Sequence, residues 1–572
     1  MATKSTLTEL REEVISHVSK ALERDIEEKE VLLSYPPDIT LGSIAFGCFS
    51  IAKNEDKAPA ELSSKLAEKI NGNIEKKELI ENAESAGPYI NFKTKNIAKN
   101  VIEEIEKKKE KYGKSEKKGK TILFEFSQPN THKSFHVGHV RGTVLGQAMV
   151  NAFNANGYDI IPINYSGDVG AHIEKILWMM EKNHDGETAP KNKTEYLGSI
   201  YTEAEKALEK NPDLKKEVED IRKRIEEGDK KLLKLWKTTR KWSIDELNEI
   251  YKELGVTFKR WYFESEFEKT GKKIVQKLLD EGIAKVSEGA TIVDLSKYNL
   301  DVFLILRSDG SPLYSTKELA LAEEKIKDFN FDEALVQTDV RQKLYFQQFF
   351  KTLELMGIDT PMTNQTYDFV DLPTGAMSSR RGNVITYDSL RDELIESTKK
   401  ETEKRHSDWK EDKINSVASA LALATLKFEM LKVDTQKKIT FDTKRALSFE
   451  GFTASYILYT AARINSILKK GKVKKGKSEL HTLDTDEEKS IIHSLLRYPE
   501  VTEEVVKEYN PAKLANYLFD LTKLYSHFYH SHKILEAESE SLVQARLLLS
   551  TQVKSVIESG LSLLGIEAVE EM

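Results

Sequence analysis

The order of apolar segments between residues 121 and 165 constrains the fold most. The run TILFEF (121–126) precedes a polar loop, then apolar residues recur every four positions from Val140 to Ala152, and YDIIPINY (158–165) completes the unit. The outer segments have the composition of strands, and the middle one has the period of a helix. Strand, helix and strand over this length predict a βαβ unit with two parallel strands.

The same alternation returns later in the chain. Residues 186–290 are highly charged and predict a long helical insertion. Further strands are predicted at 302–307, 333–338 and 366–371, with helices near 315–328 and 341–356 between them. Two βαβ halves separated by an insertion predict an α/β domain over residues 121–387, with a Rossmann-like, doubly wound parallel sheet.

The flanking regions predict different domains. With 572 residues, the chain is too long for a single hydrophobic core. Residues 1–105 mix helical and strand patterns and predict an α+β domain, 106–120 form a lysine-rich linker, and 388–572 show only helical patterns. We therefore expect an all-α C-terminal domain.

Composition limits the classes of protein and site. Cys48 is the single cysteine, which excludes internal disulfides and cysteine-based metal clusters. No stretch approaches the roughly 18 consecutive apolar residues of a membrane span, so we expect none. The charged N-terminal pattern MATKSTLTELREEV lacks an apolar signal region, so we expect a cytoplasmic location. The lysine runs at 107–120 and 469–477 fit either solvated linkers or contacts with a nucleic-acid backbone, and charge alone does not decide between them.

The loop SQPNTHKSFHVGHVRG (127–142) concentrates the polar chemistry. His136 and His139 lie three apart at a predicted helix start, so they point to one side of its first turn. A zinc site would need more ligands than the loop offers, and a histidine nucleophile would need an orienting carboxylate. The helix N-terminus, two imidazole donors and Lys133 suit phosphate oxygens. Gly138, Gly142 and Gly146 allow either a ring to approach the helix or tight helix–sheet packing.

Several sequence motifs resemble those of a known enzyme family. HVGH (136–139) resembles the HIGH signature of class I aminoacyl-tRNA synthetases, and EFSQPNTHKSFHVGHVRG is similar to arginyl-tRNA synthetases in particular. NYSGDVGAH (164–172), RSDGSPLYSTKELA (307–320) and VRQKLYFQQFF resemble further motifs of that family, and AMSSRRGNVI (376–385) stands where its KMSKS loop belongs. The C-terminal helices resemble its anticodon-binding domain, and the N-terminal region resembles its tRNA-contacting domain.

The resemblance implies an arginine–tRNA ligase that activates L-arginine with ATP and transfers it to the terminal ribose of tRNA-Arg. It implies ATP and ATP-borne Mg²⁺, no metal site of the protein's own, and a monomer. The implied catalytic residues are Lys133, His136, His139, Arg380 and Arg381. The implied ATP-binding residues are His136, Gly138, His139, Met377 and Ser378. The implied arginine-binding residues are Glu125, Asn130, Tyr314, Glu318 and Gln342. Tyr459 and Arg463 would contact tRNA.

Several positions depart from the family pattern. Ser379 replaces the usual lysine of the KMSKS loop, and Lys133 supplies the cation that many arginyl enzymes carry before HIGH. Glu318 stands where an aspartate is usual, Val169 where a tryptophan is usual, and Ala376 also departs. Two alternatives stay open, a catalytically silent tRNA-binding relative and a class I synthetase for another amino acid.

Aromatic and histidine residues cluster near the C-terminus. Stacking on anticodon bases and core packing are both open for the cluster formed by Tyr525, Phe528 and Tyr529. The spacing of His527, His530 and His532 does not place all three on one helical face, which disfavours a metal site.

Overall fold

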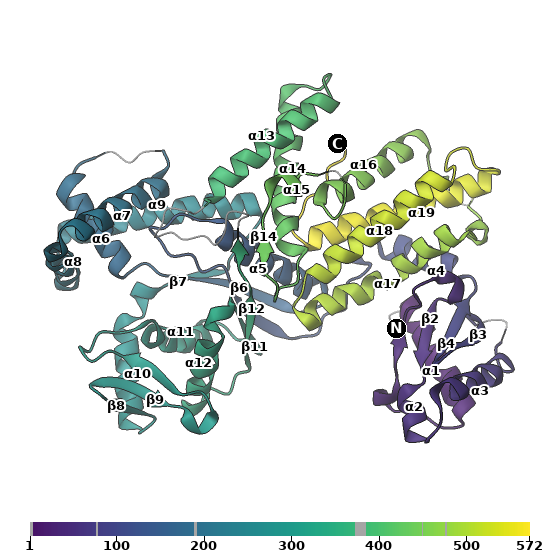
Figure 1. Cartoon of the computed structure of the whole chain (residues 1–572), viewed down its shortest axis with the longest axis horizontal. Helices are drawn as coiled ribbons and strands as arrows, with labels where there is room; N and C mark the ends of the chain where they lie inside the picture. The colour runs from purple at the N-terminus through teal and green to yellow at the C-terminus, as the bar shows by residue number, and fades with distance from the viewer. Residues whose placement is uncertain (1–3, 76–77, 188–190, 372–384, 449, 475–477) are drawn as a thin grey trace.

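A five-stranded parallel sheet forms the centre of the protein, in the order β12-β11-β5-β6-β7. The computed structural model describes residues 4–75, 78–187, 191–371, 385–448, 450–474 and 478–572 (Figure 1). The strands are β5 (Thr121–Glu125), β6 (Asp159–Ser166), β7 (Arg260–Phe263), β11 (Glu333–Asp339) and β12 (Met362–Tyr367). The strand order reverses at β5, because β6 and β7 lie on one side of it and β11 and β12 on the other. This confirms the doubly wound sheet, whose ligand site is expected at that reversal.

Helices cover the sheet and join its strands. Apolar runs bury β5 almost completely, and α5 packs beside it through a face that is buried along nearly its whole length. The connecting helices are α5 (Val137–Ala155), α6 (Ala171–Asn183), α10 (Glu268–Asp280), α11 (Tyr314–Asp328) and α12 (Lys343–Leu355).

One predicted strand lies outside the parallel sheet. The segment predicted at 302–307 forms β10 (Val302–Leu306), which pairs antiparallel with β9 (Ala290–Asp294), and β9 pairs with β8 (Ala284–Ser287). The fifth parallel strand is instead β7, which pairs with β6 inside the region assigned to the insertion. The helical part of the insertion therefore ends before β7. Its helices are α7 (Lys193–Lys210), α8 (Lys215–Glu227) and α9 (Lys230–Leu254).

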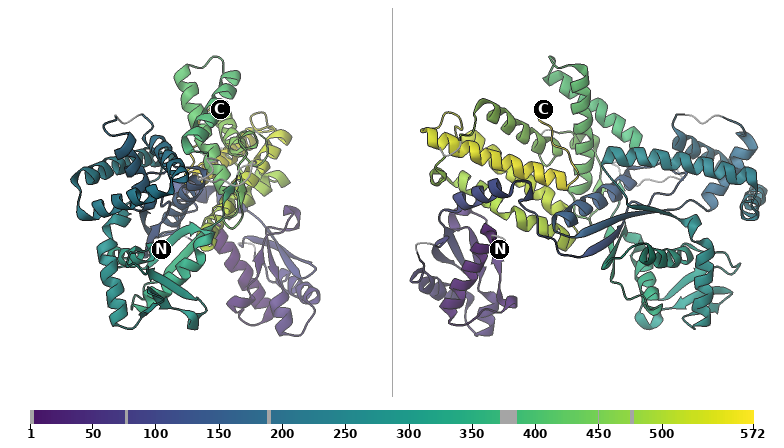
Figure 2. Two further views of the ribbon diagram at one scale, coloured as in Figure 1. Left: turned by 60° about the vertical axis from the view of Figure 1, so that its left-hand side comes forward. Right: turned by 180° about the vertical axis from the view of Figure 1, so that it is seen from behind.

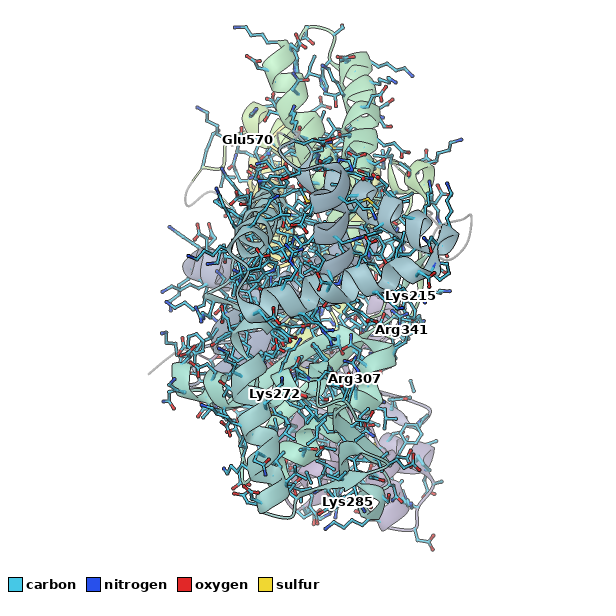
Figure 3. All side chains as sticks on the ribbon, turned by 90° about the vertical axis from the view of Figure 1, so that its left-hand side faces the viewer. Lys215, Lys272, Lys285, Arg307, Arg341 and Glu570 are labelled. Atoms are coloured by element: carbon cyan, nitrogen blue, oxygen red, sulfur yellow. The ribbon has the colours of Figure 1, made fainter. Side chains whose placement is uncertain are left out.

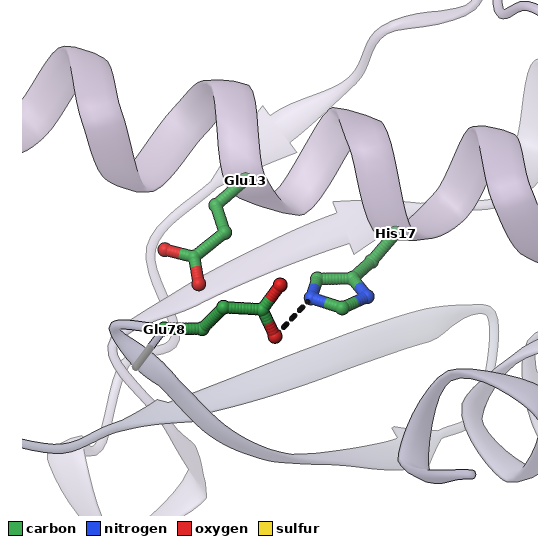
Figure 4. A group of neighbouring side chains, drawn as sticks. All are labelled: Glu13, His17 and Glu78. Carbon is green, nitrogen blue, oxygen red and sulfur yellow. Dashed lines mark hydrogen bonds and ion pairs between the residues drawn. The ribbon is translucent and has the colours of Figure 1, made fainter. Parts of the chain in front are cut away.

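The N-terminal region is an α+β unit with its own antiparallel sheet, in the order β1-β2-β4-β3. Its elements are α1 (Thr6–Leu22), β1 (Leu33–Ser34), β2 (Ile44–Gly47), α2 (Phe49–Asn54), α3 (Pro59–Asn71), β3 (Ile80–Ala86), β4 (Tyr89–Thr94) and α4 (Ile97–Lys108). Glu13 and His17 lie four residues apart on α1 and face Glu78, whose Oε2 is 3.2 Å from His17 Nε2 (Figure 4). Both carboxylate oxygens of Glu13 accept a hydrogen bond from the Leu79 N–H. These contacts tie α1 to the start of β3.

The N-terminal unit docks on α17 of the C-terminal region. Glu500 of α17 pairs with Arg11 and accepts a hydrogen bond from the Tyr35 hydroxyl. In the lysine-rich segment, the Tyr112 hydroxyl donates to the Leu495 carbonyl at 2.8 Å, and the Ser115 N–H donates to the Ala155 carbonyl at 2.8 Å. This part of the predicted linker is therefore fixed against its neighbours.

Over its described residues, the C-terminal region is all-α apart from one short strand. Its elements are α13 (Tyr387–Arg405), α14 (Glu411–Leu431), β14 (Ile439–Thr440), α15 (Thr443–Ala446), α16 (Ala454–Lys470), α17 (Asp486–Glu508), α18 (Ala512–Ser531) and α19 (Glu540–Leu563). Seen from both sides, the parallel sheet lies between this bundle and the helical insertion (Figure 2). By length and composition, α14 is apolar enough to cross a membrane, but 67% of its apolar window is buried inside the protein. This is the pattern of a core helix.

Candidate active site

The loop between β5 and α5, residues 127–136, has a strained backbone that its neighbours hold in place. We call it the signature loop. Ser127, Gln128 and His132 have φ angles of 75°, 52° and 61°, a region that non-glycine residues seldom adopt. The Gln128 N–H donates to Asn164 Oδ1 at 3.0 Å, and the Thr131 N–H donates to the Gly167 carbonyl at 2.9 Å. Such strain persists where surrounding contacts enforce it, and it is concentrated at functional sites.

His132 has a structural role in this loop. Its side chain is 1% exposed, with Nδ1 2.9 Å from Thr131 Oγ1 and Nε2 2.8 Å from Thr239 Oγ1. Burial lowers its pKa to about 3, so it stays neutral. Both ring nitrogens are used in bonds to α9 and the loop, which leaves the other two histidines of the loop for chemistry.

His136 and His139 form a stacked pair at the start of α5, with ring centroids 3.7 Å apart. His136 Nδ1 accepts from the Gly138 N–H, and His139 Nδ1 accepts from the His136 N–H, both at 3.2 Å. Burial lowers the pKa of His136 to about 4, and burial also holds the pKa of His139 well below its usual value. A neutral imidazole that accepts at Nδ1 carries its proton on Nε2. Both rings therefore offer Nε2–H donors at neutral pH.

Lys133 places a positive charge beside these rings. Its side chain is exposed, and its charge contributes to the lowered pKa of His136, His139 and His172. The structure thus brings Lys133, His136 and His139 together at one helix N-terminus, as the sequence predicted. Two imidazole donors and an ammonium together can bind phosphate oxygens.

Two glycines of α5 serve packing against the sheet. A Cβ on Gly142 would lie 2.4 Å from the Tyr367 hydroxyl, and one on Gly146 would lie 2.1 Å from Phe126 Cδ2. Gly142 and Gly146 therefore allow tight packing between the helix and the sheet, which is one of the two alternatives that the sequence left open. Beside them, the buried Arg141 donates to carbonyl oxygens of Phe369 at 3.1 Å and of Lys437 at 2.9 Å, which fastens two distant segments to α5.

A cavity of about 1000 Å³ opens beyond the carboxyl ends of β5, β6, β11 and β12. Six of the predicted site residues line it: Asn130, His136, Gly138, His139, Tyr314 and Gln342. Arg341, which also lines it, forms two hydrogen bonds with the Asp339 carboxylate at 2.8 and 3.0 Å. In the view of Figure 3, Arg341 lies between Lys215 of the insertion and Arg307.

One end of the cavity is acidic. Glu264 lines it and pairs with Lys317 at 2.9 Å, while Glu125 and Glu318 are each 1% exposed behind it. Burial, followed by the charge of Glu125, raises the pKa of Glu318 to about 8. Glu125 pairs with the buried Lys325, a residue that the sequence did not single out. Nothing in the sequence links these two positions, because they lie on different elements 200 residues apart.

Among described residues, three buried side-chain atoms at this end have no hydrogen-bond partner: Glu318 Oε1, the Tyr165 hydroxyl and the Tyr345 hydroxyl. The Tyr314 ring lies between the two other tyrosines, with centroid distances of 5.9 and 5.5 Å. Buried polar atoms without partners are costly, and their grouping in one place indicates a binding site for a polar ligand.

The predicted residues Met377, Ser378, Arg380 and Arg381 lie outside the described residues, as do Ala376 and Ser379. The described residues before position 372 and after position 384 adjoin the cavity. Asp371 lines it, and the Val137 N–H donates to the Ile385 carbonyl at 3.2 Å. Similarly, the Tyr387 N–H donates to the Phe135 carbonyl at 2.8 Å, so the signature loop and the start of α13 are joined.

A second groove lies on the C-terminal helices. It has a volume of about 430 Å³ and is lined by Tyr459, Arg463, His527 and His530, among others. The Arg463 guanidinium lies 4.8 Å from the Tyr459 ring and 4.9 Å from the Tyr529 ring.

The rest of the C-terminal cluster divides between core and surface. Tyr525 and Phe528 are fully buried core residues, whereas Tyr529 is 36% exposed. His527 and His532 lie 3.6 and 4.0 Å from Glu487, and His530 lines the groove instead.

The fold and the cavity together define the class of protein. A doubly wound sheet whose first strand leads into an H-x-G-H helix start, with a helical insertion between the halves, is the catalytic arrangement of class I aminoacyl-tRNA synthetases. Residues 101–443 match the family described as tRNA synthetases class I (R), catalytic domain. Residues 8–94 match the arginyl tRNA synthetase N terminal domain, and residues 457–572 match the DALR anticodon binding domain. The chain belongs to the arginyl-tRNA synthetase family.

Relatives resemble the chain over nearly its whole length. A protein of Halothermothrix orenii named arginine–tRNA ligase is 32% identical, over 99% of this chain and 100% of its own. One of Bdellovibrio bacteriovorus with the same name is 34% identical over 94% and 93%. Arginyl-tRNA synthetase of Thermus thermophilus has a TM-score of 0.81 at 23% identity, covering 98% of this chain and 100% of its own. At 23% identity, this structural similarity shows the fold alone.

Proposed function

We propose that the protein ligates L-arginine to tRNA-Arg at the expense of ATP. The observation that carries this is the cavity itself, which has neutral imidazole donors at one end and an acidic, buried end with unpartnered polar atoms at the other. The full-length relatives named arginine–tRNA ligase support the same reaction. ATP and an amino acid with a cationic side chain fit the two ends.

At the imidazole end, His136 and His139 donate Nε2–H bonds to ATP phosphate oxygens while Gly138 adjoins the nucleotide. The arginine carboxylate oxygen attacks the α-phosphorus, a new P–O bond forms, and the bond to pyrophosphate breaks. Lys133, with Arg380 and Arg381, stabilises the charge that builds up on the phosphates, and Met377 and Ser378 complete ATP binding. Fixed donors and cations are the usual source of catalysis in such transfers.

Mg²⁺ arrives bound to ATP. Four carboxylates of the described residues line the cavity. Asp339, Asp371 and Glu264 are paired with Arg341, Lys438 and Lys317, and Asp368 accepts a hydrogen bond from the Phe369 N–H at 2.7 Å. They are therefore poor candidates for a resident metal site, whereas phosphate oxygens are ligands that Mg²⁺ prefers.

At the acidic end, Glu318, Glu125, Asn130, Tyr314 and Gln342 bind the arginine side chain. A guanidinium has donors in a fixed planar fork, and these residues offer carboxylate, amide and hydroxyl oxygens. Lysine would leave several acceptors unpaired in a buried site, which disfavours it without an editing step.

Tyr459 and Arg463 bind unpaired bases of the tRNA through the second groove, because stacked rings and a guanidinium suit base faces. We further infer that the enzyme works as a monomer in the cytoplasm. Sedimentation of the pure protein at micromolar concentration tests the first statement, since a dimer would sediment at about twice the mass of 65.2 kDa.

A charging assay tests the proposed function. Purified protein, ATP, Mg²⁺ and tRNA-Arg should attach labelled arginine to the tRNA, and labelled lysine or cysteine should not be attached. Attachment of another amino acid would indicate a synthetase of different specificity. Binding of tRNA-Arg without attachment would indicate a silent relative, which the departures at Ala376, Ser379 and Val169 keep open.

A further inference from the structure

Carboxylates outnumber lysines at the acidic end of the cavity. Three carboxylates meet there, from Glu125 of β5, from Glu264 after β7 and from Glu318 of α11. Two lysines accompany them, because Lys325 pairs with Glu125 and Lys317 pairs with Glu264. When all three carboxylates are ionised, one negative charge remains without a lysine partner among the described residues, and it belongs to Glu318.

Lys325 is buried on α11, as Lys317 is. Its side chain is 9% exposed, whereas that of Lys327, two residues further along, is 74% exposed and pairs with Glu324 at the surface. A lysine is seldom buried unless it has a charged partner. Glu125 has a second fixed contact, because its Oε1 accepts from Gln128 Nε2 of the signature loop at 2.7 Å. Lys325 therefore fixes the carboxylate of Glu125, and this carboxylate binds Gln128 of the signature loop.

We propose that Lys325 is a positioning residue for arginine recognition, which fixes Glu125 and reduces the acidic end of the cavity to the single negative charge that one guanidinium neutralises. This inference rests on the proposed function. Lys325 does not line the cavity, so it acts through Glu125 and Glu318 and not by touching the substrate.

The groups around Glu318 make the proposal sensitive to pH. Burial and the charges of Glu125 and Glu264 raise its pKa, whereas Lys325 and a hydrogen bond from Tyr314 lower it. The hydroxyls of Tyr165 on β6 and Tyr345 on α12 also face it and stay protonated, because burial raises their pKa values.

The direction of the pH effect follows from these groups. In the empty cavity Glu318 holds a proton below its pKa of about 8. A guanidinium requires the ionised form, so binding releases this proton. The KM for arginine should therefore fall as the pH rises towards 8 and then level off.

Removing the lysine alone, in Lys325→Met, takes away an influence that lowers the pKa of Glu318. The KM for arginine should rise about tenfold at pH 7, and the pH at which it levels off should move up by about one unit. The KM for ATP should stay within about twofold. Lys325→Arg keeps the charge and should restore the wild-type profile, while Lys327→Met, on the exposed side of the same helix, is the matched control.

The double variant Glu125→Gln/Lys325→Met separates charge from packing. It removes both members of the pair, and Glu125 affects the pKa of Glu318 more strongly than Lys325 does. The pH at which KM levels off should therefore return to the wild-type value or below it. If Lys325 only supported the packing, the KM for arginine of the double variant would be at least as high as that of Lys325→Met. The pH at which this KM levels off would then stay at the wild-type value.

The experiment measures tRNA charging from pH 6 to 9 at varied arginine and ATP, with thermal unfolding of each variant as a check on folding. If wild type does not charge tRNA with arginine, the proposed function fails. If wild type does so and Lys325→Met keeps the wild-type pH profile, only the inference about Lys325 fails. If Lys325→Met does not fold, the profiles of Lys325→Arg and of the double variant decide, and a double-variant profile shifted upward would overturn the proposal.

Discussion

Lys133 should be the main catalytic cation contributed by the signature loop. Its charge already acts on His136 and His139, so it lies close to the atoms that meet the phosphates. An ammonium about 5 Å from a phosphate oxygen contributes about 3 kcal/mol at an effective dielectric constant of about 20. Exposure to solvent weakens this, and about 2.7 kcal/mol corresponds to about a hundredfold change in rate. Lys133→Ala should therefore lower kcat about a hundredfold.

The assay is ATP–pyrophosphate exchange with arginine and tRNA-Arg present. The KM for arginine should change less than about threefold, because the acidic end of the cavity is untouched. Burial, the largest cause of the lowered pKa of both histidines, persists in the variant, so the pH dependence of kcat near neutrality should not move. Lys133→Arg should keep most of the rate, and Lys175→Ala removes a nearby lysine that pairs with Glu205 as a control. An unchanged kcat in Lys133→Ala would refute the reasoning.

Three further variants test other parts of the fold. Gly146→Ala places a Cβ 2.1 Å from a ring atom of Phe126, and denaturant unfolding should show a loss of about 1–3 kcal/mol. Glu500→Ala removes the carboxylate that anchors the N-terminal unit, and hydrogen exchange in β1 and β2 should speed up while exchange in β5 stays the same. Arg463→Ala removes the guanidinium held between two tyrosines, and the Kd for tRNA-Arg at fixed salt should rise about tenfold without a change in arginine KM.

The parallel sheet could be predicted from the sequence except at one position. VFLILR (302–307) is continuously apolar, like a strand buried on both faces, but Val302 and Leu304 are 50% and 41% exposed on one face of the antiparallel sheet. Apolar residues at exposed positions hid the alternation that would have indicated a half-buried strand. The real fifth strand, β7, has only the residues RWYF and follows a long helix, so its signal was too short to separate from the insertion.

The candidate site was predictable where its residues are neighbours in sequence. The placement of His136 and His139 follows from a helix start, because their spacing alone puts both rings on one turn. The ion pair between Glu125 and Lys325 is different. It exists only because β5 pairs with β11, at Leu335↔Phe124 and Val336↔Glu125, while α11 packs over the sheet. Sequence spacing cannot supply a contact that depends on which strands become neighbours.

The two ends of the cavity differ in the charge that their residues carry. In the proposed reaction, arginine brings a cation into the cavity that also binds the anionic ATP, and protonated histidines beside the phosphates would add to the positive charge near it. Burial keeps His136 neutral down to about pH 4, so it donates hydrogen bonds without a charge. The loss of arginine affinity between pH 8 and pH 6 should then come from Glu318, whose pKa is raised to about 8, and not from the histidines. Glu318→Gln tests this, because it should raise the KM for arginine and abolish its pH dependence in that range, whereas a dependence that persists would assign it to another group.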